Sequence, residues 1–446
     1  MTTEDLTRNG LRRTLFSMTW PMLFGVVSLL GFQLVDSAFI GQLGVEPLAA
    51  LGFTLPMQQL IIGFQVGLGI ATTAIIARTL GSGDTTLAHR LGGLVVLSGA
   101  LAVALLCLLL WTLREPLVTL LGAERELLPL IRAFWIPWLL SAWCGAILYL
   151  GYSVMRAHGD TRVPGLWMVL TSLVNLALDP LYIFVFGWGL PGAAWATVTA
   201  FTVGIAAIYP ALVRRGLLHF DLLSINPVPA LRQLAGITGP AMLSQLMPPI
   251  SAMLATALVA GFGSSAVAAW GLGTRLEFFS IVVALALTMS LPPMVGRFLG
   301  AGELGHVRTL VRIAVRFVLA WQLALAVLWL ALSGLLPRLL TQDATVAETL
   351  EDYLLRVPLS YGALGVCMLM VSVCNALGLP MRALTISLVR LFICYLPLLW
   401  AGAWLMGLNG LFTGALLGNI AAGMVAWSLY RKGMSALEQR TAAAAG

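Results

Sequence analysis

Two short segments, Arg78-Thr-Leu-Gly-Ser-Gly83 and Arg297-Phe-Leu-Gly-Ala-Gly302, carry the same pattern 219 positions apart. Outward from them the offset persists: Gly44 matches Gly263, and further small residues match in the same order along most of the chain. Matches that keep one offset over such a length indicate an internal repeat. The sequence therefore predicts two structurally similar halves.

Both halves are too apolar to belong to a water-soluble protein. Of the 446 residues, 60% are apolar and 10% charged, whereas an average soluble domain is about 45–50% apolar and about 25% charged. This composition excludes a cytosolic enzyme, a nucleic-acid binder and a disordered chain. A membrane-spanning helix needs ~20 mostly apolar residues, and twelve such stretches can be drawn, six in each half.

We therefore predict an all-α polytopic membrane protein. Its twelve transmembrane helices should form two six-helix repeats around a central cleft. The repeats should be parallel, because a half with an even number of spans inserts the same way up as the other. The predicted parts are a cytoplasmic N-terminus (1–13), an N-lobe (14–213), a cytoplasmic linker (214–231), a C-lobe (232–430) and a cytoplasmic tail (431–446).

The distribution of basic residues predicts the orientation. With the N-terminus inside, 18 of the 25 Lys and Arg residues lie at cytoplasmic ends of spans, as the positive-inside rule requires. The net charge of +7 is thus a topology signal. We expect a multi-pass protein of the bacterial cytoplasmic (inner) membrane with both termini in the cytoplasm. The five cysteines all lie in apolar stretches without a CxxC pair, so neither disulfides nor a structural metal are expected.

Two aspartates are the main polar groups inside the predicted spans. Asp36, Asp179 and Thr197 should lie at one depth, ~6–10 Å below the outer surface at ~1.5 Å per helical residue. Asn175 precedes Asp179 by four residues and so shares its helix face. Pro180 follows and disrupts the helix, because its ring removes a backbone donor.

These groups form an oxygen-rich pocket, and two interpretations of it are possible. It can hold Na⁺, or a proton shared between two buried carboxylates; alternatively it is a polar cluster that only joins helices. At the corresponding positions the second half has Ala255 and Leu398, or Pro397 after one deletion. Carboxylates that only joined helices should recur in both halves, so this asymmetry favours ion coupling in the N-lobe.

Further polar residues within spans are candidates for the substrate cleft. Arg275 and Glu277 stand two apart and do not share a helix face, so each needs a partner on another helix. Two interpretations of these residues remain: a structural ion pair, or contact with the substrate in the cleft. Methionines add a deformable apolar wall. The candidates for cleft residues are Gln33, Gln58, Met168, Arg275 and Glu277.

The chain resembles the multidrug and toxic compound extrusion (MATE) family, in its DinF-like branch. The resemblance covers residues 10–430 and rests on Trp20-Pro21, Val35–Gly41, Asn175–Pro180 and the paired Arg-x-Leu-Gly segments. It implies a two-lobe exporter that exchanges H⁺ or Na⁺ for a drug-like cation. The N-lobe cation site that it implies consists of four residues already gathered by depth, Asp36, Asn175, Asp179 and Thr197.

The expected function is secondary antiport, in which amphipathic, often cationic compounds leave the cell in exchange for H⁺ or Na⁺. A lipid-linked sugar or lipid flippase of the same superfamily is the alternative, and a channel is a weaker one. A membrane-embedded enzyme is not expected, because no His lies deep within a span. The expected partners are small drug-like molecules and the lipid bilayer, with no nucleic acid, no cofactor and a monomeric state.

Overall fold

The computed structural model describes residues 7–122, 125–221 and 226–445, and most of them are helical. Within these residues, eleven helical segments are long and apolar enough to cross a membrane. The last segment, Pro380–Thr441, contains two residues with non-helical backbone angles, Met406 and Gly407. A break at these residues divides the segment in two and gives the twelve spans predicted from the sequence.

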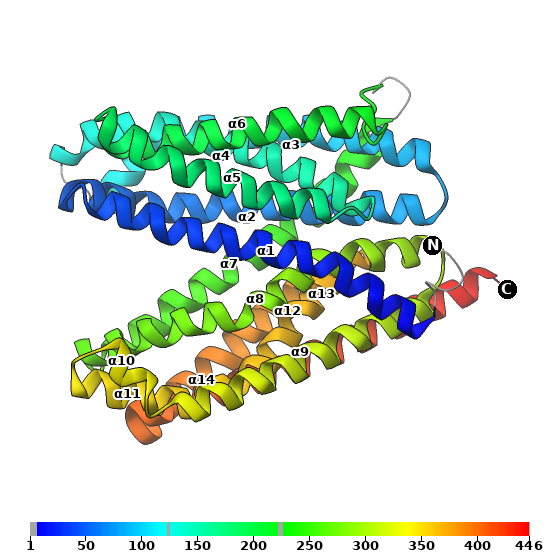
Figure 1. Cartoon of the computed structure of the whole chain (residues 1–446). Coiled ribbons are helices and arrows are strands. Elements are labelled where there is room, and N and C mark those ends of the chain that lie inside the picture. Colours follow the sequence, from blue (N-terminus) through cyan, green and yellow to red (C-terminus); the bar gives the residue numbers. More distant parts are fainter. Residues whose placement is uncertain (1–6, 123–124, 222–225, 446) are drawn as a thin grey trace. The chain divides into compact units, whose positions relative to one another are not determined.

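The elements follow one another along the chain as long helices joined by short turns (Figure 1). The first half contains α1 (Arg8–Gly41), α2 (Val45–Gly81), α3 (Thr85–Leu120), η1 (Arg125–Leu127), α4 (Leu128–Ala157), α5 (Arg162–Pro180), η2 (Leu181–Val185) and α6 (Gly189–Arg214). The second half contains α7 (Pro227–Ala260), α8 (Ser264–Gly300), α9 (Leu304–Leu332), α10 (Leu336–Leu340), α11 (Ala344–Arg356), η4 (Val357–Ser360), α12 (Tyr361–Ala376), α13 (Pro380–Val389), η5 (Arg390–Tyr395) and α14 (Leu396–Ala445).

The repeat is visible in the helix bounds and in the backbone. Helices α1 and α7 both have 34 residues, and α2 and α8 both have 37. The glycines before α2 and α8 both have a positive φ, 113° at Gly44 and 102° at Gly263. Side chains disfavour this conformation, so glycine is needed at both positions. The two halves therefore repeat in structure as well as in sequence.

The chain divides into two compact units. The N-unit is Ser17–Met242, and the C-unit is Leu243–Gly446 together with the residues up to Phe16. The unit boundaries thus differ from the predicted lobes at two helices. The first turns of α1 belong to the C-unit, where Phe16 meets Phe317 of α9 edge-on at 4.6 Å. The first half of α7 belongs to the N-unit, where the backbone of Thr238 packs against Gly67 of α2.

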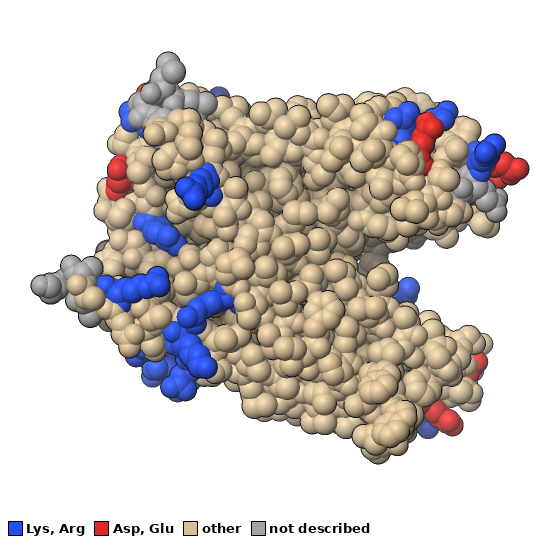
Figure 2. Space-filling model, turned by 180° about the vertical axis from the view of Figure 1, so that it is seen from behind, with Lys and Arg blue, Asp and Glu red and all other residues tan. Residues whose placement is uncertain are grey.

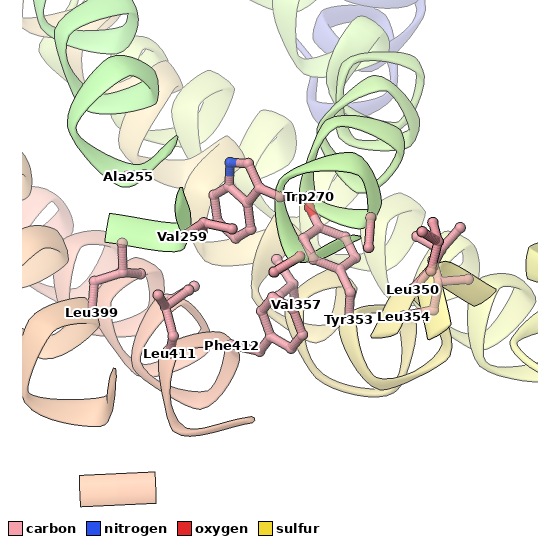
Figure 3. Packing of buried hydrophobic residues seen from close by; sticks show 14 of the residues in the cluster. Ala255, Val259, Trp270, Leu350, Tyr353, Leu354, Val357, Leu399, Leu411 and Phe412 are labelled. Carbon is pink, nitrogen blue, oxygen red and sulfur yellow. The ribbon is translucent and has the colours of Figure 1, made fainter. Parts of the chain in front are cut away.

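Three aromatic rings form the centre of the C-unit core (Figure 3). Trp270 of α8 and Phe412 of α14 are stacked with centroids 6.2 Å apart. Tyr353 of α11 meets both rings edge-on, at 5.7 and 5.5 Å. Such edge-on and offset pairs are each worth ~0.5–1.5 kcal/mol beyond the area that they bury. The rings therefore fix α8, α11 and α14 relative to one another.

Charged side chains lie mainly at the helix ends. On the face shown in Figure 2, the charged side chains lie near the ends of the helices, and the middle is almost free of charge. An uncharged middle is what a bilayer core requires, because a charge in hydrocarbon is costly. The five cysteines are free and buried.

Candidate functional site

The candidate site begins where α5 ends. Pro180 is the last residue of α5, and the chain continues as the π-helical turn η2. The N–H of Phe186 donates to the carbonyl of Leu181 at 2.9 Å, which closes this wide turn. Proline has no N–H to continue the α-helical ladder, and π-turns of this kind often occur at functional sites. Asp179 is the residue directly before this irregularity.

Asn175, Asp179 and Thr197 form one buried hydrogen-bond network. The side chains of Asp179 and Asn175 are 0% and 2% exposed. In the orientation that satisfies both ends of its amide, Asn175 donates to the two Asp179 carboxylate oxygens at 2.8 and 3.1 Å. The Asn175 oxygen then accepts from the Thr197 hydroxyl at 2.9 Å and from its N–H at 3.1 Å. The network joins α5 to α6 and directs the carboxylate of Asp179.

Helix α1 packs closely against α5 at the end where α5 begins. A side chain at Gly165 would overlap the carbonyl of Pro21, and a Cβ at Gly25 would lie 3.0 Å from the sulfur of Met168. Two glycines, one on each helix, therefore allow a close crossing at this end. The contact also places the buried Met168 between α1 and α5.

The same two helices run in parallel as far as the Asp179 network. Towards their other end, Phe39 of α1 meets Phe184 of η2 edge-on at 6.1 Å. Between the two contacts both helices advance by nearly the same number of residues, so Asp36 and Asp179 lie at corresponding positions along them. Asp179 is within electrostatic reach of Asp36. The structure thus joins Asn175, Asp179 and Thr197 in one N-unit network, and that Asp36 completes a coupling site with them stays a prediction.

The carboxylate of Asp36 is incompletely satisfied. Its Oδ1 is buried and has no hydrogen-bond partner among the described residues. A buried polar atom without a partner is costly, and two ionised carboxylates in one poorly solvated site repel each other. A proton or a monovalent cation relieves both penalties. In the part of the chain that the structure describes, no three His, Cys, Asp or Glu side chains are arranged to hold a metal ion.

The predicted cleft residues are divided between the two units. Gln33, Gln58 and Met168 belong to the N-unit, with Gln33 exposed, Gln58 half-buried and Met168 buried. Arg275 and Glu277 belong to the C-unit, where Arg275 is exposed and Glu277 is half-buried. Their contact with a substrate remains a prediction.

Glu277 lies beside two tyrosines that sequence reasoning missed. The Tyr353 hydroxyl donates to the Glu277 carboxylate over a long 3.5 Å, and it lies 3.1 Å from the Tyr361 hydroxyl. Neither of the two candidate ion-pair residues, Arg275 and Glu277, has an oppositely charged group within 4.0 Å among the described residues. The tighter 3₁₀ turn η4 separates the two tyrosines. The only feature of the sequence that could have pointed to this cluster is that two tyrosines lie in one apolar span.

Gly273, one turn before Glu277, makes room for the Tyr353 ring. A Cβ at this position would lie 2.6 Å from Cε1 of Tyr353. We expect Gly273→Ala to lower the stability of the protein by ~1–3 kcal/mol, because the ring must leave its packed position. The thermal unfolding midpoint in detergent measures this loss. Gly271→Ala is the matched control, since a Cβ there meets nothing within 4 Å; equal midpoints for the two variants would contradict the expectation.

Comparison with known proteins agrees with this architecture. The MatE family model matches residues 21–181 and 240–401, two matches that begin 219 residues apart. A protein of Shewanella oneidensis described as a "FAD transporter" is 34% identical over 426 residues, which are 94% of each chain. "Probable multidrug resistance protein YpnP" of Bacillus subtilis is 26% identical over 97% of this chain and 98% of its own.

A solved structure is also similar over nearly the full length. The crystal structure of the Vibrio cholerae MATE transporter VcmN in the bent form has a TM-score of 0.94 and 55% sequence identity, and it covers 97% of this chain and 99% of its own. The two family matches cover most of the twelve spans, and the similar proteins are membrane transporters and not enzymes. The chain therefore belongs to the MatE family of MATE transporters.

Proposed function

We propose that this protein exports amphipathic, often cationic compounds in exchange for H⁺ or Na⁺ by alternating access. The coupling site in this proposal is Asp36, Asn175, Asp179 and Thr197. The observation that carries it is the buried, unpartnered Oδ1 of Asp36 beside the Asp179 network. An oxygen-lined site with two carboxylates and an unsatisfied acceptor is suited to a small cation.

The coupling follows from the charge of the site. Without an ion, repulsion between the carboxylates of Asp36 and Asp179 opposes close approach of α1 and α5 at this depth. Binding of H⁺ or Na⁺ removes that repulsion, so the ion has different affinities for the open and closed arrangements. A ligand shifts a conformational equilibrium only through such a difference. Pro21 gives α1 a compliant point for the movement, since its missing N–H weakens the helix there.

The orientation in the membrane is part of the proposal. We place both termini in the cytoplasm of a bacterial inner membrane, because 18 of the 25 Lys and Arg residues then lie on the inner side. The coupling site then lies nearer the outer surface, where an inward ion gradient supplies H⁺ or Na⁺. A monomer is sufficient for this mechanism, since all four site residues come from one unit of one chain.

A flavin dinucleotide is a second candidate substrate. The Shewanella oneidensis relative that is 34% identical to this chain is named a FAD transporter. FAD carries phosphates and is an anion, so it differs in charge from the cations of the first proposal. The two substrates can therefore be separated in one assay.

The test is transport by the purified protein in liposomes, with a pH gradient and a Na⁺ gradient imposed separately. We expect one of the two gradients to drive a fluorescent aromatic cation out of its compartment at several times the rate seen without a gradient. The same vesicles loaded with FAD test the second substrate. Movement that neither gradient accelerates would refute the coupling, and movement of FAD alone would replace the substrate class while leaving the coupling intact.

A further inference from the structure

The chain leaves α6 through a short segment that lies across the ends of other N-unit helices. We call this segment, Arg215–Asp221, the strap. Gly216 has a φ of 67°, and the N–H of Leu217 donates back to the carbonyl of Leu212 at 2.9 Å. This arrangement is a glycine-dependent helix end, and it turns the chain sharply after α6. The strap therefore returns over the end of the N-unit at which α3 begins (Figure 1).

Two consecutive glycines of α3 form the seat of the strap. Leu218 is 3% exposed and packs against Gly92. A side chain at Gly93 would overlap the carbonyl of His219. The N–H of His219 donates to the carbonyl of His89 at 3.1 Å, in the first turns of α3. The strap is thus docked by one buried leucine, one backbone hydrogen bond and an ion pair at each of its ends, Arg215 with Asp160 and Asp221 with Arg90.

Three histidines converge at this seat from three different segments. His89 of α3 lies 5.3 Å from His158, which follows α4, and 5.5 Å from His219 of the strap, measured between ring centroids. The first pair is tilted and the second is edge-on. His89 and His158 are half-buried, and His219 is exposed. Neutral rings in this geometry attract one another, whereas protonated rings repel.

Four of the other charged groups around the seat form two ion pairs. Arg90 lies 3.8 Å from Asp221, and Arg215 lies 2.6 Å from Asp160. Arg156 is buried and donates to Ser153. The charged groups on the packed elements, α2 included, are Arg78, Asp84, Arg90, Arg156, Asp160, Arg162, Arg214, Arg215 and Asp221. The two ion pairs are neutral in sum and partly exposed, so they add little net field, and the histidines carry the charge change.

We propose that His89, His158 and His219 form a proton-binding latch that holds the strap when neutral and releases it when protonated. Imidazole in water takes up a proton at pH ~6.5. Two unit charges ~5 Å apart at a partly exposed site repel enough to shift an equilibrium on the order of tenfold.

Hydrogen exchange of the strap tests the latch directly and does not depend on transport. The full chain in lipid nanodiscs is compared at about pH 7.5 and about pH 5.5, on either side of the ordinary imidazole titration. Each rate is corrected for the intrinsic pH dependence of amide exchange. We expect the corrected exchange of the His219 amide, whose N–H is bonded to His89, to rise on the order of tenfold at the lower pH.

Three variants separate the latch from a general effect of acid. The double variant His89→Gln, His219→Gln keeps the backbone bond but binds no proton there, so its strap should stay protected at the lower pH. His306→Gln is the matched control, because this fourth histidine lies in the C-unit beside Glu303 at 3.1 Å. It should respond like the wild type. Gly93→Ala should expose the strap at both pH values, because the new methyl group occupies its seat.

Three results would overturn the proposal. The first is equal protection of the wild-type strap at both pH values, while the strap of Gly93→Ala exchanges rapidly. This would show that the assay detects release of the strap but that acid does not cause it. The second is a pH response that persists in the double variant, which would place the response in other groups. The third is a wild-type pH response that disappears when a chelator is added, which would assign it to a bound metal ion.

Discussion

Replacement of either aspartate of the candidate site by asparagine should abolish ion-coupled export. In Asp179→Asn the side chain keeps its size, and Asn175 and Thr197 remain in place, but the group no longer takes up a proton or holds a full negative charge. We expect the gradient-driven efflux rate to fall about 100-fold or more, as for loss of a group on which a whole step depends. Asp36→Asn should have the same effect, because the two carboxylates act as a pair.

The folded state of these variants must be shown to be intact. Both should elute as one species and unfold at or above the wild-type midpoint, because removing a buried charge relieves repulsion. Asp352→Asn is the matched control: it removes a carboxylate that pairs with Arg356 at 2.9 Å in a partly exposed position. Its transport should equal that of the wild type. Coupled efflux at wild-type rates in both Asp36→Asn and Asp179→Asn would remove this site from the mechanism.

Gly410→Ala should severely destabilise the C-unit. The two segments of α14 on either side of Met406 and Gly407 fold back on each other through glycines. A Cβ at Gly410 would overlap the backbone carbonyl of Gly402, and a Cβ at Gly402 would overlap that of Gly410. Backbone cannot turn away as a side chain can, so the helices must separate. We expect a loss of about 3 kcal/mol or more.

The measurement is the yield of monodisperse protein and its thermal unfolding midpoint in detergent. Gly305→Ala in α9 of the same unit is the control, because a Cβ there meets nothing within 4 Å. This control should be neutral or slightly more stable, since alanine favours helix more than glycine does. A Gly410→Ala protein as stable as Gly305→Ala would show that close contact between Gly402 and Gly410 does not hold the two segments of α14 together.

The sequence alone was sufficient for the features that depend on local composition and spacing. Apolar stretches of sufficient length specify the spans, because a bilayer core admits few other structures. The repeat is detectable because glycines such as Gly44 and Gly263 occupy backbone conformations that side chains disfavour. Asn175 and Asp179 were placed on one face by helical periodicity, and they are in contact in the structure.

Only the tertiary structure decided which distant groups meet. The Tyr353 hydroxyl reaches Glu277 because Gly273 leaves room for the ring and the 3₁₀ turn η4 follows α11, and neither effect has a local signal. The histidine latch likewise depends on the path of the strap over α3. Helical periodicity gives the face on which a side chain lies, but the residue opposite it depends on how helices far apart in sequence pack, and that is set by side-chain and backbone shape over the whole unit.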